Sequence, residues 1–150
     1  MYNEIAKGYN NLYKEEQLKK LNIIKQYFHP KPILLDLGCG TGIAMEFFNI
    51  ESIGLDPSTE LLKQAKGKVI CGKAENIPFK DNYFNSLICL TAIHHCNLNK
   101  AINEIKRVCK GSICITVLKK AKKSKEITNK LIKELNLKLI EEEKDYILIK

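Results

Sequence analysis

Residues 33–42 read Ile-Leu-Leu-Asp-Leu-Gly-Cys-Gly-Thr-Gly, and this stretch decides the fold that the sequence predicts. An apolar run leads into Asp36, and glycines follow at the alternate positions Gly38, Gly40 and Gly42. The run predicts a buried strand, and the glycines predict a tight turn whose backbone can lie close to a ligand. The next segment is typical of a helix, whose free N–H groups would point back at that ligand. Taken alone, the motif is also compatible with a strand-to-helix turn that binds nothing.

The rest of the chain alternates short apolar runs with helical segments. Strands are predicted at residues 33–37, 52–55, 68–71, 84–90, 113–118, 137–140 and 146–149. Helices are predicted at residues 43–49, 59–66, 99–110 and 122–135, and in two pieces over 1–28. This alternation is typical of βαβ units and a parallel sheet with both faces covered, and the short last link makes the final pair antiparallel. We therefore predict an α/β fold, a Rossmann-like seven-stranded mostly parallel sheet with an antiparallel C-terminal strand and helices on both faces.

Composition narrows the class of protein. No repeat or linker divides residues 1–150, so one domain is predicted. No apolar run approaches the ~20 residues that cross a bilayer, and the first residues lack the order of a signal peptide, so we expect a cytoplasmic protein without a membrane partner. The six cysteines show no zinc-like spacing, and no metal site is predicted. The formal charge of +8 rests almost entirely on lysine, because Arg107 is the only arginine.

A second acidic residue helps to identify the ligand that the glycine turn could bind. Asp56 ends the second predicted strand, 18 residues after Gly38. The ends of neighbouring parallel strands lie side by side, so this carboxylate should face the same crevice and could accept hydrogen bonds from both ribose hydroxyls of a nucleoside. Asp36, just ahead of the glycines, would repel a pyrophosphate but would favour a ligand that bears an ammonium and a sulfonium. The combination predicts a cationic adenosine-containing ligand and argues against a dinucleotide.

The order of the motifs resembles the class I S-adenosylmethionine-dependent methyltransferases of the type 11 domain family. The resemblance covers nearly the whole chain and rests on residues 2–10, 35–42, 54–58, 74–79, 93–95 and 104–108. It implies S-adenosylmethionine as the cofactor and transfer of its methyl group, by direct displacement, to an unidentified acceptor that is a small molecule or tRNA. It also implies a helical lid over residues 1–28 and a Rossmann-like core over residues 33–150.

The resemblance assigns roles around the glycine turn. Gly38, Cys39 and Gly40 would lie against the methionine and ribose portions of the cofactor. Asp36 would orient the amino group, directly or through water, and Asp56 would bind the ribose hydroxyls. The further cofactor contacts that it implies involve Tyr9, Pro57, Ser58, Ala74, Glu75 and Thr91.

These further contacts surround the two ends of the cofactor. Pro57 or Ser58 would lie beside the adenine, and the N–H of Ala74 would meet its edge. The backbone at Thr91 would reach the methionine end, over which Tyr9 would close. The family usually has an aspartate immediately before the alanine of the adenine loop, where this sequence has a lysine, so that side-chain contact is not implied here.

His94 and His95 follow the fourth predicted strand and are the candidate catalytic residues. A general base is needed only where the acceptor must lose a proton, and a structural or substrate-contacting histidine is the alternative interpretation. Six lysines between residues 119 and 130 are typical of a solvated helix face, with an RNA track as the alternative.

Two questions stay open at this point. A non-catalytic S-adenosylmethionine-binding or regulatory subunit of the same fold is the alternative to an active enzyme. The predicted elements also include no insertion between the fifth and sixth strands, where such enzymes often build the acceptor pocket. We therefore expect either an open acceptor site or one completed by a partner subunit or a homodimer.

Overall fold

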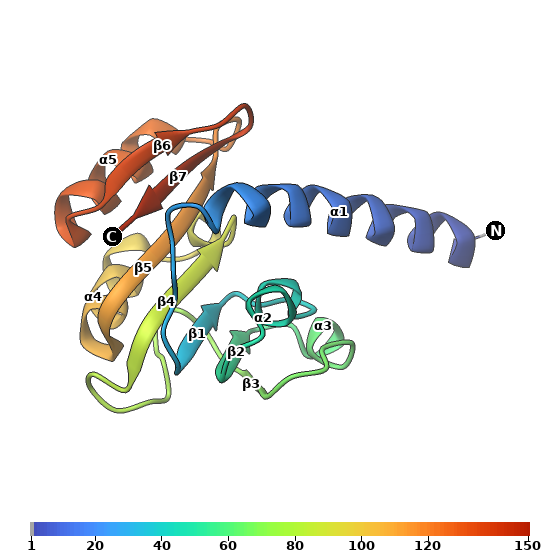
Figure 1. The fold of residues 1–150 in the computed structure, drawn as a ribbon, viewed down its shortest axis with the longest axis horizontal. Coiled ribbons are helices and arrows are strands. Elements are labelled where there is room, and N and C mark those ends of the chain that lie inside the picture. The colour runs from blue at the N-terminus through green and yellow to red at the C-terminus, as the bar shows by residue number, and fades with distance from the viewer. Residues whose placement is uncertain (1) are drawn as a thin grey trace.

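The computed structural model describes the backbone of residues 2–150 and the side chains of residues 11–150. Its centre is a seven-stranded sheet with the strand order β3-β2-β1-β4-β5-β7-β6 (Figure 1). The strands are β1 (Leu34–Leu37), β2 (Ser52–Asp56), β3 (Val69–Cys71), β4 (Phe84–Leu90), β5 (Cys109–Leu118), β6 (Lys138–Glu141) and β7 (Asp145–Ile149). Neighbouring strands are parallel except at β7, which is antiparallel to both β5 and β6. The predicted sheet is confirmed, but β5 begins four residues before the predicted strand. Cys109 pairs with Phe84 of β4, so residues 109–110 are strand and not the end of the predicted helix.

Helices cover both faces of this sheet, as the sequence predicts. They are α1 (Tyr2–Ile24), α2 (Ile43–Phe48), α3 (Thr59–Leu62), the 3₁₀ helix η1 (Ile93–His95), α4 (Leu98–Val108) and α5 (Ser124–Leu135). The apolar sides of α4 and α5 pack into the larger core cluster on one face. The second half of α1 and the start of α2 pack into a second cluster on the other face (Figure 1).

The alternation of side chains along β1 decides where its acidic residue points. Leu35 and Leu37 belong to the cluster under α4 and α5, whereas Leu34 belongs to the cluster under α1 and α2. Successive side chains of a strand point to opposite faces, so Asp36 shares the face of Leu34. The carboxylate is therefore directed toward α1 and α2.

Two helices differ most clearly from the prediction. The helix over the first residues is one element, not two pieces, because good helix formers at residues 14–17 carry the backbone through the point where the apolar pattern changes phase. The helix α3 ends at Leu62, four residues earlier than predicted. Beyond Leu62 the backbone bonds tighten to i→i−3, from Gln64 to Leu61 and from Ala65 to Leu62, which is typical of a fraying helix end.

One buried ion pair fixes α1 to the far side of the sheet. Lys20 lies 3.0 Å from Asp145 of β7, and both side chains are buried. Leu21 and Ile24, on the same side of the helix, are fully buried in the second cluster. The C-terminal half of α1 is thus part of the core, which places its preceding turns beside the glycine turn.

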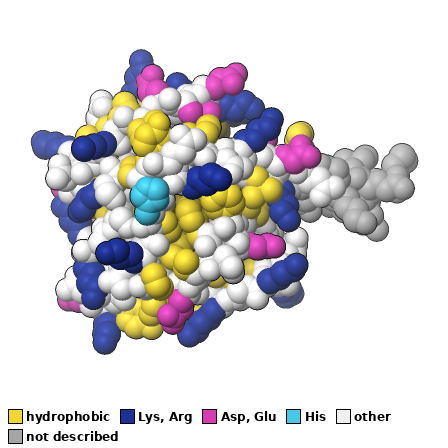
Figure 2. All heavy atoms as spheres, in the orientation of Figure 1, with side chains coloured by type: hydrophobic (Ala, Val, Ile, Leu, Met, Phe, Trp, Pro, Cys, Tyr) yellow, Lys and Arg dark blue, Asp and Glu magenta, His cyan; other side chains and the backbone are white. Residues whose placement is uncertain are grey.

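The surface combines dispersed charge with a hydrophobic centre. In Figure 2, lysine and arginine side chains are spread around the outline of one face, and hydrophobic side chains gather in its middle. Among the described residues, no helix has both the length and the apolar character that crossing a bilayer would require.

Candidate cofactor site

The glycine turn between β1 and α2 has the tight geometry that its sequence predicts. Gly38, Gly40 and Gly42 have φ values of 73°, 53° and 83°, a region that residues with a side chain rarely adopt. The N–H groups of Gly38 and Cys39 both donate to the carbonyl of Leu55, at 2.7 and 3.0 Å, which anchors the turn to β2. A Cβ on Gly38 would lie 2.6 Å from the Cβ of Ala92, so this position has no room for a side chain.

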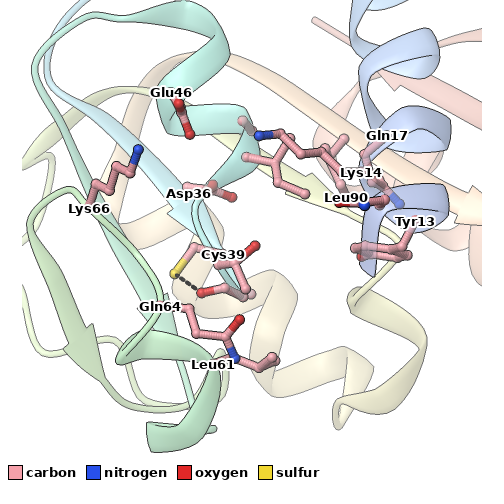
Figure 3. A pocket seen from close by; sticks show the side chains of 16 residues that line it. Tyr13, Lys14, Gln17, Asp36, Cys39, Glu46, Leu61, Gln64, Lys66 and Leu90 are labelled. Atoms are coloured by element: carbon pink, nitrogen blue, oxygen red, sulfur yellow. Dashed lines mark hydrogen bonds between the residues drawn. The ribbon is translucent and has the colours of Figure 1, made fainter. Parts of the chain in front are cut away.

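Two cavities meet at Gly38. The first, of about 440 Å³, we call the Asp36 cavity; it is lined by Tyr13, Gln17, Asp36, Gly38, Gly40 and Lys66, among others. Figure 3 shows Asp36 in its middle, with residues of α1 on one side and Lys66 on the other. The second, of about 460 Å³, we call the Asp56 cavity; it is lined by Gly38, Asp56, Pro57, Ala74, Ala92 and His95, among others. A ligand that passes over Gly38 can therefore occupy both cavities.

The Asp36 carboxylate is buried, with 2% of its surface exposed. Burial, and secondarily the negative charge of Asp56, raises its pKa to about 7. The free protein thus holds a carboxyl group that is only partly ionised at neutral pH. A cationic ligand group in the Asp36 cavity would stabilise the ionised form and lower this pKa.

Gln17 adds a second acceptor to the same cavity. Its side chain is buried, and its Oε1 atom has no hydrogen-bond partner among the described residues. A buried carbonyl oxygen without a partner is costly, so a donor in this cavity would stabilise it. An ammonium group in the Asp36 cavity is such a donor.

Asp56 links the glycine turn to the end of β2. Its Oδ2 accepts a hydrogen bond from the N–H of Gly40 at 2.9 Å, and its Oδ1 accepts one from the N–H of Ser58 at 2.8 Å. Each carboxylate oxygen has a second lone pair, so both can still accept from a ligand hydroxyl. The structure thus positions Asp56 rigidly at the wall of its cavity, as binding of a ribose diol would require.

Cys39 presents its main chain, and not its side chain, to the site. Its thiol is directed at β2, because a Cβ on Gly54 would lie 2.6 Å from the Cys39 sulfur. Burial, with Asp36 and Asp56 nearby, raises the pKa of the thiol far above its usual range. Cys39 is therefore a small packing residue and cannot act as a thiolate nucleophile.

The opposite end of the Asp56 cavity is formed by the loop after β3. Ala74 is buried there, and Pro57 faces it from the end of β2. Lys73 lines the cavity where the family has an aspartate, so no carboxylate acceptor faces a ligand from that position. Ser58 uses its hydroxyl to cap α3, and the Glu75 carboxylate accepts from the N–H of Asn97 at 3.1 Å.

The only arginine of the chain holds this loop against α4. Arg107 donates to the carbonyls of Ile77 and Phe79, at 2.8 and 2.7 Å. It also makes two hydrogen bonds to Glu104, whose carboxylate accepts in turn from the N–H of Ile77. Paired bonds of this kind need the planar guanidinium, so a lysine could not replace it. The sequence motif at residues 104–108 thus serves the Asp56 cavity indirectly.

We expect Arg107→Ala to loosen the loop after β3. Amide hydrogen exchange at Ile77 should accelerate, because this variant removes the group that orients its Glu104 acceptor. Affinity for an adenosine ligand should fall with it, since Ala74 lies on the same loop. The matched control is Lys106→Ala, which removes only an exposed ion pair with Glu134 and should leave both measurements unchanged. Equal exchange rates in the two variants would contradict this role.

Strain marks the end of β4. Thr91 has a φ of 50°, which is unfavourable for a β-branched residue, and its N–H donates to both the carbonyl and the hydroxyl of Thr116. Its neighbours on either side, Leu90 and Ala92, line the Asp36 and Asp56 cavities respectively. The N–H of Thr91 is thus already used within the protein, and strained backbone of this kind is typical of ligand-binding segments.

The two adjacent histidines differ in their surroundings. His95 is exposed and lines the Asp56 cavity. His94 stacks against it with ring centroids 3.9 Å apart, and its Nδ1 is buried without a partner among the described residues. Burial and the neighbouring His95 lower the pKa of His94, which favours the neutral form of its ring. The structure brings His95, but not His94, to the wall of a described cavity.

Some lining residues are not among the cofactor contacts that the sequence predicts, although those from α1 lie within the predicted lid over residues 1–28. Tyr13, Lys14 and Gln17 reach the Asp36 cavity from α1, and Lys66 reaches it from the turn after α3. One face of α1 carries Tyr13 and Gln17 at helical spacing from the buried Leu21 and Ile24. A polar glutamine on this apolar face is the sequence signal that could have indicated its place in the cavity.

The predicted lid spans residues 1–28, and its side chains are described from residue 11 onward. The side chain of Tyr9, which is predicted to close over the cofactor, lies outside the described residues.

Comparisons with known proteins agree with this geometry. Residues 35–115 match a family model described as a methyltransferase domain. An uncharacterized protein of Methanocaldococcus jannaschii is 38% identical over 116 residues, which are 73% of this chain and 46% of the relative. The 18S rRNA (guanine-N(7))-methyltransferase of Bos taurus is 36% identical over 77 residues, which are 45% of this chain and 27% of that protein. The chain spans about half the length of the first curated relatives it matches.

A solved structure gives the same assignment. The S-adenosylmethionine-dependent methyltransferase of Thermotoga maritima superposes with a TM-score of 0.62 and 28% identity, over 67% of this chain and 51% of that one. The matched region of the family model contains the glycine turn, Asp56 and the loop after β3. S-adenosylmethionine is the cofactor of this family. The chain belongs to the class I S-adenosylmethionine-dependent methyltransferases.

Proposed function

We propose that the chain is an active methyltransferase that binds S-adenosylmethionine across the Asp36 and Asp56 cavities. One observation carries this proposal: the two cavities meet at a glycine that has no room for a side chain, and each contains a carboxylate. The methionine portion would lie in the Asp36 cavity and the adenosine in the Asp56 cavity. The unpartnered Oε1 of Gln17 supports this orientation, because it needs a donor such as the ammonium of the amino acid.

Each proposed contact involves a residue that lines one of the two cavities. Asp36 and Gln17 would bind the ammonium, and Asp56 would accept hydrogen bonds from the ribose hydroxyls. The adenine would lie between Pro57 and Ala74. Lys73 leaves adenine recognition to the backbone of that loop, because a lysine cannot accept a hydrogen bond from the adenine amino group.

Bound S-adenosylmethionine supplies a methyl group activated by a positively charged sulfur. The protein's part is to align the acceptor with that group and to exclude water, since positioning can account for much of the rate. We propose His95 as the general base. Its ring would take up the proton of a methyl acceptor that must lose one. The ring of His94, which contacts that of His95, would support His95 in this position.

The acceptor belongs to one of two classes. Curated relatives that match part of this chain include an 18S rRNA (guanine-N(7))-methyltransferase, which favours RNA. The Thermotoga maritima structure is named as a candidate histamine N-methyltransferase, which favours a small amine. A partner subunit or a homodimer that completes the acceptor site stays a prediction, and a monodisperse monomer with full activity would contradict it.

A labelled-methyl assay distinguishes an enzyme from a non-catalytic binding subunit. The protein is incubated with S-adenosylmethionine that carries a radioactive methyl group and with fractionated cell extract. Label should enter one fraction with the wild type and fall at least tenfold with Asp56→Asn, which removes a charge-assisted acceptor worth about 1.5–3 kcal/mol. Binding of the cofactor without any transfer to RNA, protein or small metabolites would instead favour the non-catalytic alternative.

A further inference from the structure

Five of the seven residues between Lys119 and Lys125 are lysines, a segment that we call the lysine loop. It connects β5 to the first turn of α5. Four of these side chains are exposed, at positions 120, 122, 123 and 125, whereas the Nζ of Lys119 lies 5.5 Å over the ring of Tyr146. The described salt bridges use Lys20, Lys63, Lys106, Arg107 and Lys144, and none of them involves the loop.

The fold places the lysine loop at the same edge of the sheet as the cofactor site, because both follow the carboxyl ends of parallel strands. Strands β4 and β5 are parallel, with Leu90 opposite Thr116, and Thr91 donates to Thr116 across the strand ends. The loop begins three residues beyond Thr116, and the segment after β4 contributes Ala92 and His95 to the Asp56 cavity. An acceptor that approaches the end of β4 therefore lies at the same edge of the sheet as these positive charges.

The backbone of the loop is well fixed even though its side chains are exposed. The N–H of Lys119 donates to the carbonyl of Lys144 at 2.8 Å, and the hydroxyl of Ser124 donates to the carbonyl of Lys119 at 2.8 Å. Ser124 itself is buried. Because the backbone is already fixed, binding of a ligand by these lysines would not have to order the loop itself, which reduces the entropy that binding would cost.

We propose that the methyl acceptor is an RNA whose phosphates lie along the lysine loop. This proposal rests on the methyltransferase activity proposed above. Four exposed lysines exceed what one small acceptor can use, whereas a polyanion gains from each contact through the release of counterions. Lys66 and Lys73, at the two cavities, extend the positive charge to the other side of the site. The loop contains no arginine, so the contacts that we propose are charge contacts of lysine to phosphates and not paired hydrogen bonds to base edges.

A charge-matched pair of variants tests the loop. The loop variant replaces four exposed lysines and is Lys120→Gln, Lys122→Gln, Lys123→Gln and Lys125→Gln. The control variant replaces four exposed lysines near the starts of strands, at the opposite edge of the sheet, and is Lys68→Gln, Lys80→Gln, Lys110→Gln and Lys138→Gln. Both variants lower the net charge equally, so a difference between them reports position and not total charge.

Binding to a labelled single-stranded RNA is measured across salt concentrations. The slope of log affinity against log salt should be shallower by up to about 3 in the loop variant, because each phosphate that a lysine no longer neutralises reduces the slope by ~0.7. Affinity at low salt should fall at least tenfold. The control variant should keep most of the wild-type slope and affinity. The same slope in both variants would overturn the proposal.

Methyl transfer and cofactor binding complete the test. Label should enter total RNA, disappear on ribonuclease treatment and fall at least tenfold with the loop variant. All three proteins should bind S-adenosylmethionine equally, which separates this proposal from the proposed function. If the wild type does not bind the cofactor, the proposed function fails, whereas the salt slopes still test the loop. Label that enters protein or small metabolites, and not RNA, overturns the RNA proposal alone.

Discussion

Replacing Asp36 with asparagine should make the cofactor-free protein more stable above pH 7. The pKa of Asp36 is raised from 3.8 to about 7 in the folded chain, chiefly by burial. Between these values the unfolded chain releases a proton that the folded chain retains. The free energy of unfolding of the wild type therefore falls as pH rises from 4 to 7 and levels off above that range. Ionisation of the buried carboxyl group therefore lowers the free energy of unfolding by at most about 4 kcal/mol, at ~1.4 kcal/mol for each unit of pKa.

Urea denaturation at several pH values measures this difference. The stability gain from Asp36→Asn should be near zero at pH 4 and should reach its full size at about pH 8. The neutral amide removes the buried charge, while the shape of the side chain stays the same. A gain that did not change with pH would contradict the buried carboxyl, since a packing effect has no reason to titrate.

The same substitution should weaken binding of S-adenosylmethionine. Wild-type affinity should fall about tenfold between pH 7.5 and pH 6, because protonation removes the negative charge that pairs with the ammonium. Asp36→Asn should bind more weakly at pH 7.5 and show no such pH dependence. The control ligand is 5′-methylthioadenosine, which carries the adenosine but no ammonium, and its affinity should change with neither pH nor Asp36→Asn. A pH dependence shared by both ligands would place the titrating group elsewhere.

Gly38→Ala should abolish cofactor binding and destabilise the fold. The φ of 73° costs an alanine about 1–2 kcal/mol. Its Cβ would also lie 2.6 Å from the Cβ of Ala92, and overpacking of this kind costs about 1–3 kcal/mol more. We therefore expect a loss of about 2–5 kcal/mol in urea denaturation. Because both cavities meet at this residue, the affinity for S-adenosylmethionine should fall at least a hundredfold.

Two further variants separate strain from steric clash. A Cβ on Gly40 would have its nearest contact 3.9 Å away at Leu61, although its φ of 53° is also positive. Gly40→Ala should therefore lose only the stability that a positive φ costs an alanine. Adding Ala92→Gly to Gly38→Ala removes the clash and should recover the difference in stability. If the double variant is no more stable than Gly38→Ala alone, the close approach to Ala92 is not the cause.

The sequence predicted much of the fold because its decisive signals are local. The residues of β4 match the predicted strand in full, and the glycine turn lies where three glycines alternate after an apolar run. The boundary of α3 was wrong, since apolar spacing alone does not distinguish an α-helix from i→i−3 turns. The continuity of α1 was missed because the change of phase in its apolar residues resembles a break.

The candidate site was predictable only in part, because several of its properties come from contacts between distant residues. Asp56 and Asp36 could be selected by their places at strand ends. The burial that raises the pKa of Asp36, and the unpartnered oxygen of Gln17, depend on how α1 packs against the sheet. The role of Arg107 likewise depends on a loop some 30 residues earlier in the chain. No local pattern reports such contacts.

Calorimetric titration of S-adenosylmethionine into the wild type and Asp56→Asn tests the central claim most directly. We predict one cofactor per chain, displaced by 5′-methylthioadenosine, because the adenosine of both ligands would occupy the Asp56 cavity. Asp56→Asn should remain folded and lose at least tenfold in affinity for both ligands, since it replaces the carboxylate that would accept from the ribose. A folded wild type that does not bind the cofactor, or an Asp56→Asn variant that binds it as tightly, would contradict the account.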